Sequence, residues 1–408
     1  MNAWHDVEDV IKEVTRVYRY QEIRTPYFES TNVFKRENDS SDMVNKEMYT
    51  FQMGSDSYTL RPEGTAGVIR AFDQHKLYGS MELPSRFYYC GAMFRHERPQ
   101  KGRQRQFTQF GVENIGAKSP ELDAETIALG YDIVKKMGIS SVKVLINTLG
   151  DDDSRSAYRE ALKDHFRPVL NDLCEDCQAR FEKNPLRILD CKVDAKNPVM
   201  ASAPRTIDYL SEKAKAHFDK VCNLLDDLEI EYVVDTNLVR GLDYYSHTVF
   251  EIISDDPKLG AGSTIGGGGR YNGLVEELGG PATPGVGFAF GMERLMLALD
   301  DEDDEENGID VYVMPLGDEA RDLAMQIITM LRANGFTCDM DYAGRGLKGQ
   351  FKSSDRFGAH LSIIIGEDEV KGEYVNIRCN HSKEQSEVKL EDILSYIENH
   401  YEGDHEHE

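Results

Sequence analysis

The sequence contains no run of about 18 consecutive apolar residues, the minimum for a helix that spans a bilayer. Residues 1–20 also lack the apolar stretch of a secretory signal, because charged side chains interrupt them throughout. Cysteine is sparse: the chain has seven, an odd number spread over 408 residues, which argues against an extracellular disulfide framework. These absences exclude an integral membrane protein and predict a cytoplasmic chain with free thiols.

Positive charge is in deficit. The chain has 47 Lys and Arg residues against 73 Asp and Glu residues, a net charge of −26. Such a chain repels a polyanion at long range, which excludes a protein that coats nucleic acid through its overall charge. An RNA partner needs local basic patches, and two candidates are residues 95–105 and the helically spaced Arg345, Lys348, Lys352 and Arg356. Taken alone, each patch is more simply explained as a solvated charged face.

An acidic run without apolar residues, DDEDDEEN at 300–307, separates two parts of different pattern, and we interpret residues 301–308 as a linker. In residues 1–300, strand-like runs alternate with glycine-rich turns and long insertions, which favours an α+β domain with helices packed on an antiparallel sheet. Residues 309–401 alternate strands and helices, as a small α/β domain does, and residues 402–408 form an acidic tail.

Hydrophobic periodicity predicts the elements of the second domain. They are strands at 310–315, 336–340, 361–365 and 374–379, and helices at 319–334, 347–357 and 390–401.

Residues 151–235 are charged and helical in pattern, which predicts a helical subdomain inserted into the first domain. They contain Cys174 and Cys177 in the sequence CEDC, and a further Cys191. A structural zinc site takes four ligands in paired spacing, and this stretch offers only three thiolates. The sequence therefore weighs against zinc and assigns no metal ligand.

The most informative segment is residues 86–116, RFYYCGAMFRHERPQKGRQRQFTQFGVENIG, which is typical of a strand, a basic loop and a returning strand. Because side chains of a strand alternate between its faces, Gln109, Gly111 and Glu113 share one face. Two acceptor-capable side chains around a gap describe the floor of a pocket for a small polar ligand. Arg95 beside them carries a planar guanidinium that can hold a phosphate through two parallel hydrogen bonds.

A G-x-x-x-x-G-K-[ST] motif is absent, so the glycines of residues 260–273 do not form a P-loop around phosphates. They equally fit a sharp turn or a close approach of backbone to another group.

Four stretches together resemble class II aminoacyl-tRNA synthetases, and among these the histidyl-tRNA synthetase family. In the family's order, and over nearly the whole chain, they are RPEGT at 61–65, FRHE with its basic loop and the returning QFTQFGVE at 94–113, LVRGLDYY at 238–245, and the glycine-rich 266–294. The second resembles motif 2 of the class, and Gly291 with Arg294 resembles motif 3.

The resemblance implies an ATP-dependent ligase that joins L-histidine to tRNA(His). The histidine carboxylate first attacks the α-phosphorus of ATP, giving histidyl-adenylate and pyrophosphate, and the terminal ribose hydroxyl of the tRNA then attacks the adenylate. Two anions meet in the first step, so catalysis is mostly charge neutralisation and alignment. ATP enters with Mg²⁺, and no tightly bound organic cofactor is expected.

Three arginines are implied to carry catalysis. Arg95 would hold the α-phosphate, Arg294 would hold the γ-phosphate of a bent ATP, and Arg240 would lie between the histidine carboxylate and the α-phosphate. There Arg240 would supply charge that other class II enzymes draw from a metal ion. By the same match the ATP site also includes Glu97, Arg103 and Phe107.

Histidine has two ring nitrogens, and a site that selects it must answer both. The resemblance gives this task to Glu113 and Tyr245, with Tyr244 adjacent. The remaining histidine contacts implied are Glu63, Gly64, Thr65, Arg95, Gln109, Arg240 and Tyr271. Two alternatives stay open: the adjacent tyrosines are ordinary core residues, and Glu63 is a helix-capping carboxylate.

Contacts with tRNA and with a second subunit follow from the same resemblance. Arg98 and Gln100 match loop positions that read the extra guanosine of tRNA(His), and residues 345–356 would be a phosphate track on an anticodon-binding domain. Pro26 resembles the single proline of motif 1, which lies at the dimer interface, so we expect a homodimer. Family members usually carry a segment like RGTxDxLP before the first helix, where it helps to shape the active site and the dimer contacts. This sequence starts beyond that segment, so we expect less than full activity.

Two competing functions keep the same fold. A regulatory paralogue in histidine biosynthesis binds histidine without charging tRNA, but it lacks an anticodon domain such as residues 309–401. A tRNA-sensing module with an inactive site would lose the three arginines. Histidine-dependent exchange of pyrophosphate into ATP separates the enzyme from both.

Overall fold

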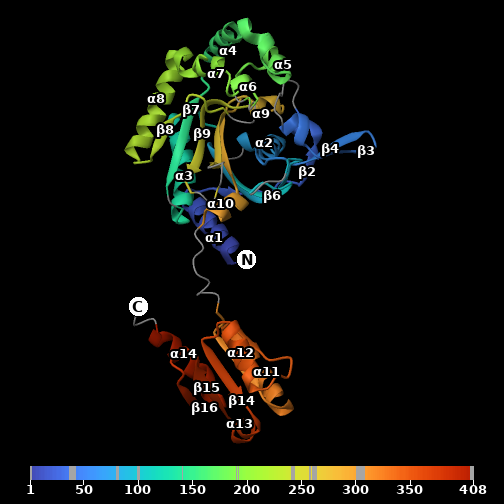
Figure 1. Ribbon diagram of the computed structural model, residues 1–408, viewed down its shortest axis with the longest axis vertical. Helices are drawn as coiled ribbons and strands as arrows, with labels where there is room; N and C mark the ends of the chain where they lie inside the picture. The colour runs from blue at the N-terminus through green and yellow to red at the C-terminus, as the bar shows by residue number, and fades with distance from the viewer. Residues whose placement is uncertain are drawn as a thin grey trace. The chain divides into compact units, whose positions relative to one another are not determined.

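A computed structural model of the chain describes residues 2–35, 43–79, 82–98, 102–139, 141–189, 191, 193–239, 244–256, 259, 264–299 and 308–404. The chain forms two compact units, Met1–Asp300 and Asp301–Glu408, each with its own sheet (Figure 1). Among the described residues, no helix combines the length and apolar character needed to cross a membrane.

The first unit is built on an eight-stranded sheet in the order β1-β5-β6-β11-β10-β9-β7-β8. Its strands are β1 (Gln21–Glu22), β5 (Ser85–Phe94), β6 (Gln106–Ile115), β7 (Val142–Thr148), β8 (Tyr232–Val234), β9 (Ser246–Ser254), β10 (Thr264–Tyr271) and β11 (Gly285–Gly291). The strands from β5 to β7 pair antiparallel, and only the pairs at the two edges are parallel. The antiparallel α+β fold expected from the sequence is confirmed.

Helices cover both faces of this sheet (Figure 1). One face packs against α1 (Asn2–Val17), α3 (Pro120–Lys136), α8 (Glu212–Asp227) and α10 (Met292–Ala298), and the other against α2 (Thr65–Gln74) and α9 (Leu274–Glu277). Strand β6 shows why the faces differ: Phe110 and Val112 lie in the core with α1 and α3, whereas Ile115 lies in the core with α2. The odd-numbered residues of β6 therefore face α2.

Two smaller structures are attached to the first unit. A three-stranded sheet in the order β2-β4-β3 consists of β2 (Phe28–Ser30), β3 (Thr50–Met53) and β4 (Asp56–Leu60). A group of helices consists of α4 (Asp152–Phe166), α5 (Glu175–Lys183), α6 (Leu186–Leu189) and α7 (Pro198–Ala201). These helices enclose a small core of their own that includes Tyr158, Phe166 and Phe181. Shorter helical turns are Thr31–Val33, Met43–Glu47, Leu77–Gly79, Arg167–Asp172, Thr206–Tyr209 and, in the second unit, Leu390–Asp392.

The second unit is a five-stranded sheet in the order β13-β12-β14-β15-β16, with parallel pairs around β12 and antiparallel pairs beyond β14. Its strands are β12 (Val311–Pro315), β13 (Cys338–Met340), β14 (Leu361–Ile365), β15 (Tyr374–Cys379) and β16 (Gln385–Lys389). Its helices are α11 (Asp318–Ala333), α12 (Leu347–Arg356), α13 (Glu367–Gly372) and α14 (Ile393–Asp404).

Candidate active site

The floor of the candidate site is the face of β6 that carries Gln109, Gly111 and Glu113. On one side β5 places Gly91, Tyr89 and Phe87 opposite these residues, and on the other side β11 places Gly291, Ala289 and Gly287 opposite them. The facing residues of β11 are small, whereas β5 places the rings of Tyr89 and Phe87 on this face. Gln109, Gly111 and Glu113 share one face of β6, as alternation along the strand predicts.

Glu113 is the centre of a buried hydrogen-bond cluster. The Thr65 hydroxyl donates to its Oε1 at 2.6 Å, the Tyr271 hydroxyl donates to its Oε2, and the Tyr89 hydroxyl lies 3.4 Å from Oε1. Burial raises the pKa of Glu113 to about 8, and the neighbouring carboxylate of Glu63 adds to the rise, although the hydroxyl donors oppose it. A carboxyl that titrates near neutral pH in a closed polar cluster suits recognition of a titratable ring.

Glycines make the room that this cluster occupies. A Cβ added to Gly287 would lie 2.2 Å from Glu113 Oε2, and one added to Gly285 would lie 2.1 Å from the Tyr271 ring. The Tyr89 ring is bounded in the same way, because added Cβ atoms would come within 2.2 Å at Gly64 and 2.4 Å at Gly111. A side chain larger than hydrogen would require the Tyr89 or Tyr271 ring to move at Gly64, Gly111 and Gly285, and the Glu113 carboxylate and Val112 carbonyl to move at Gly287.

Tyr89 is a site residue that the sequence argument missed. It is buried and has Glu113 within reach of its hydroxyl. The feature that could have identified it is the register of the β5–β6 hairpin. This register pairs Tyr89 with Gly111 and so directs both to the same face.

Glu63 caps the start of α2. Its Oε2 accepts from the backbone N–H of Thr65 at 2.6 Å, and its Oε1 accepts from that of Ala66 at 2.9 Å. These contacts correspond to the alternative that Glu63 is a helix-capping carboxylate. Both of its carboxylate oxygens accept backbone N–H groups. Glu63 thereby fixes the position of Thr65, whose hydroxyl reaches Glu113.

The adjacent tyrosines line the same region. Tyr244 and Tyr245 are both buried, with ring centroids 4.8 Å apart, and the Tyr244 ring meets the edge of Tyr271 at 5.8 Å. Gln109 Oε1 is also buried and accepts no hydrogen bond from any described residue, so an acceptor for an ammonium group is present.

The hairpin loop brings charged side chains together. Arg95 donates from Nε to the Pro62 carbonyl at 2.8 Å, and its guanidinium lies 5.1 Å from the Phe107 ring centroid. Glu97 bridges two arginines, with 3.7 Å to Arg95 and 3.7 Å to Arg103. Arg95 is thus held in place while its side chain stays 25% exposed.

Arg294 enters this group from α10. Burial lowers its pKa, and the nearby positive charge of Arg103 lowers it further. Its neighbour Glu293 accepts the backbone N–H of Thr108 at 2.7 Å, which joins α10 to β6. Arg103 and Arg294 are like charges close enough to affect one another, and such a pair is suited to a polyanion.

Two of the residues expected at the site, Arg240 and Gln100, lie outside the described residues. Arg98 is described and exposed at the end of the hairpin. In the second unit, Arg345 is bound to Asp341 at 2.6 Å and donates to the Ser353 hydroxyl, whereas Lys348, Lys352 and Arg356 are exposed on α12.

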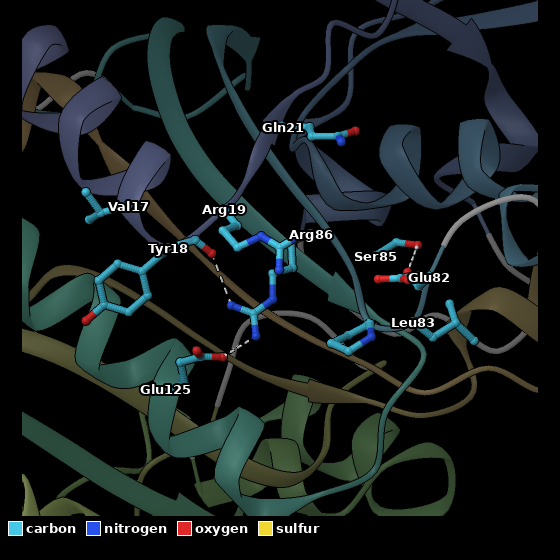
Figure 2. Close-up of a pocket in the computed structure, with 10 residues that line it drawn as sticks. Val17, Tyr18, Arg19, Gln21, Glu82, Leu83, Ser85, Arg86 and Glu125 are labelled. Atoms are coloured by element: carbon cyan, nitrogen blue, oxygen red, sulfur yellow. Dashed lines mark hydrogen bonds and ion pairs between the residues drawn. The ribbon is translucent and has the colours of Figure 1, made fainter.

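A separate groove of about 770 Å³ lies at the end of α1 and the start of β5. Figure 2 shows Arg86 in it, bound to the Tyr18 carbonyl at 3.1 Å and to the Glu125 carboxylate at 2.7 Å. The groove is lined by none of the residues of the Glu113 cluster or of the arginine group. The chemistry therefore identifies the side chains on β6 and its hairpin loop, which we call the β6 site, as the active-site candidate.

An antiparallel sheet whose hairpin ends in Arg95 and whose neighbouring strand leads into Arg294 defines a catalytic unit of the class II aminoacyl-tRNA synthetase kind. Residues 1–295 match the family model of histidyl-tRNA synthetase, and residues 310–400 match that of an anticodon binding domain. The chain belongs to the histidyl-tRNA synthetase family.

Individual relatives agree over almost the full length. Histidine–tRNA ligase 1 of Shouchella clausii (strain KSM-K16) is 51% identical over 405 residues, 98% of this chain and 95% of the relative. Histidine–tRNA ligase of Bacillus subtilis (strain 168) is 48% identical over 407 residues, 98% of this chain and 96% of the relative. The crystal structure of apo S. aureus histidyl-tRNA synthetase matches with a TM-score of 0.82 and 43% identity, covering 97% of this chain and 95% of the other.

Proposed function

We propose that this chain activates L-histidine with ATP at the β6 site and transfers it to tRNA(His). The observation that carries the proposal is that one hairpin joins the buried Glu113 cluster to the charged group of Arg95, Glu97 and Arg103. A selective site for a small polar side chain and a cationic site for phosphates thus share one strand and its loop. Adenylate formation requires both in one site.

Glu113 recognises the imidazole. A ring N–H donates to this carboxylate in place of the Thr65 or Tyr271 hydroxyl, and Tyr245 answers the second ring nitrogen, with Tyr244 supporting it. Gln109 accepts from the α-ammonium group through its buried oxygen. Glu63 acts as a positioning residue through the cap of α2, and Gly64 gives the substrate and Tyr89 room.

The arginines neutralise the phosphates. Arg95 holds the α-phosphate, Arg294 the γ-phosphate, and Arg240 the histidine carboxylate as it approaches. Glu97 and Arg103 keep Arg95 oriented, and Phe107 offers a ring face to the adenine. ATP is used as its Mg²⁺ complex, and the positive charges favour departure of pyrophosphate.

The tRNA is bound by both units. Arg98 and Gln100 contact the acceptor end, and residues 309–401 bind the anticodon through the exposed cations of α12. Residues 301–308 link the two domains, 151–235 form an inserted subdomain, and 402–408 form a tail. The protein works in the cytoplasm as a homodimer whose interface includes Pro26.

The deciding experiment is histidine-dependent exchange of pyrophosphate into ATP, followed by charging of tRNA(His). We expect exchange with histidine and little with other amino acids, and loss of about 100-fold or more in Arg294→Ala, because the guanidinium stabilises charge in the transition state. Arg86→Ala, outside the β6 site, is the matched control and retains exchange. Exchange that is absent, or that Arg294→Ala leaves unchanged, contradicts the proposal.

A further inference from the structure

The helical insertion carries three thiols and a carboxylate that histidine activation does not use. Cys174 is the N-cap of α5, Cys177 lies in the first turn of this helix, and Cys191 and Asp194 follow α6. The three sulfur atoms and a carboxylate oxygen all lie within 4.8 Å of one another. Four side chains from two separate segments thus converge on one point.

The distances between these atoms are those of ligands around an ion. Cys174 Sγ lies 3.6 Å from Cys191 Sγ, which lies 3.7 Å from Asp194 Oδ2. Two thiolates that each lie about 2.3 Å from a tetrahedral zinc ion are about 3.8 Å apart. A disulfide would instead bring its two sulfurs to about 2.05 Å. The geometry therefore favours a shared ion over a covalent bond between cysteines.

The spacing in the sequence is paired. Cys174 and Cys177 are separated by two residues, and so are Cys191 and Asp194. Structural zinc sites combine two such short pairs. The sequence argument against zinc counted thiolates alone and did not consider Asp194, which offers a fourth ligand atom.

Backbone groups support these side chains. The Cys174 N–H donates to Asp194 Oδ2 at 3.0 Å, and the Asp194 N–H donates to Cys191 Sγ at 3.5 Å. Such bonds orient ligands and reduce their negative charge around a metal. The N-terminus of α5 adds a favourable dipole for the thiolates of Cys174 and Cys177.

The cluster lies where a crosslink has a structural use. Cys177 and Cys191 are buried in the small core of the insertion, which is separate from the main core of the first unit. A core of this size gains stability from a metal that ties its segments together.

We propose that Cys174, Cys177, Cys191 and Asp194 bind one structural zinc ion that joins α5 to the segment after α6. Thiolate ligands select zinc over magnesium or calcium, which prefer oxygen. Four protein ligands fill a tetrahedral shell, so the ion takes no part in activating histidine.

The test uses the full-length protein. Metal analysis of protein purified without chelators should find one equivalent of zinc, and exchange with Co²⁺ should give sulfur-to-cobalt charge-transfer bands with the strong visible absorption of a tetrahedral ion. Cys177→Ser should lose the zinc, and Asp194→Asn should weaken binding by about tenfold or more while keeping the charge-transfer bands. Cys222→Ser, a half-buried cysteine on α8, is the control and should keep full zinc content.

Four outcomes overturn the proposal: no zinc and no cobalt spectrum in the wild type, unchanged zinc in Cys177→Ser, iron in place of zinc, or a Cys174–Cys191 disulfide detected by mass. If Cys177→Ser does not fold, the cobalt spectrum of the wild type decides the matter.

Discussion

At the scale of single residues, the proposed recognition of histidine depends most directly on Glu113. It is 1% exposed, and its hydrogen-bond donors among the described residues are the hydroxyl groups of Thr65, Tyr271 and Tyr89. Glu113→Gln should lower kcat/KM for histidine by about 100-fold, because losing a buried charge-assisted hydrogen bond costs about 3 kcal/mol. Pyrophosphate exchange at varied histidine concentrations measures this.

Glu125→Gln is the control for this change. Its carboxylate binds Arg86 in the groove of Figure 2 and is more exposed, so activity should stay close to the wild type. Equal losses in the two variants would show that Glu113 has no specific role in the β6 site.

The pKa of Glu113 also makes stability depend on pH. Its folded-state pKa of about 8 is above the ordinary 4.5, so the folded chain binds this proton more tightly than the unfolded chain does. The free energy of unfolding supplied by this group is therefore fully present below about pH 4.5 and is lost as pH rises through about 8, by up to about 1.4 kcal/mol per unit.

Glu113→Gln removes this titration, so the variant should gain stability relative to the wild type as pH rises. Urea denaturation of both proteins at about pH 5 and about pH 8 measures the change. Parallel stability curves would mean that Glu113 titrates as an ordinary carboxylate.

At the scale of elements, the start of α2 depends on one side chain. Glu63→Ala leaves the backbone N–H groups of Thr65 and Ala66 without their acceptor, so unfolding free energy should fall by about 1–2 kcal/mol. KM for histidine should rise as Thr65 shifts. Glu63→Gln keeps one acceptor oxygen, so its melting temperature should lie between those of the wild type and Glu63→Ala. A stable Glu63→Ala with raised KM would instead favour direct contact with the substrate.

Whether a feature could be predicted from the sequence depends on whether neighbouring residues or distant segments form it. The face of Gln109, Gly111 and Glu113 was predictable, because alternation along one strand decides it. The contact of Tyr89 with Glu113 was not, since it depends on the register between β5 and β6. Asp194 was missed for a related reason: it lies close to Cys174 and Cys177 only in the folded chain.

In the second unit too, success of the prediction depended on how strong the local sequence pattern of each element is. Helix α11 and strand β14 were predicted closely, because each carries a buried apolar face or run. Helix α12 was also predicted closely, although its buried residues are the polar Gln350, Ser353 and Ser354. Strand β16 was not predicted, because Val388 is its only buried residue and the others are polar. Helix α13 has six residues, too few for a helical period to register.

At the scale of the whole molecule, net charge opposes the proposed partner. With a charge of −26, long-range attraction cannot hold tRNA, so binding depends on a few local cations. Arg345 is already bound to Asp341, which leaves the exposed Lys348, Lys352 and Arg356 of α12 to meet phosphates. Removal of these charges should therefore act on tRNA alone.

The double variant Lys348→Gln/Lys352→Gln should weaken tRNA binding and flatten the plot of log Kd against log salt by about 0.8 for each lysine, because each phosphate contact releases bound counterions. Histidine-dependent pyrophosphate exchange should not change, since its residues belong to the first unit. Lys371→Gln, an exposed lysine on α13, is the control. A wild-type salt slope in the double variant would show that the anticodon phosphates lie against another surface, and a loss of exchange would show that α12 affects the active site.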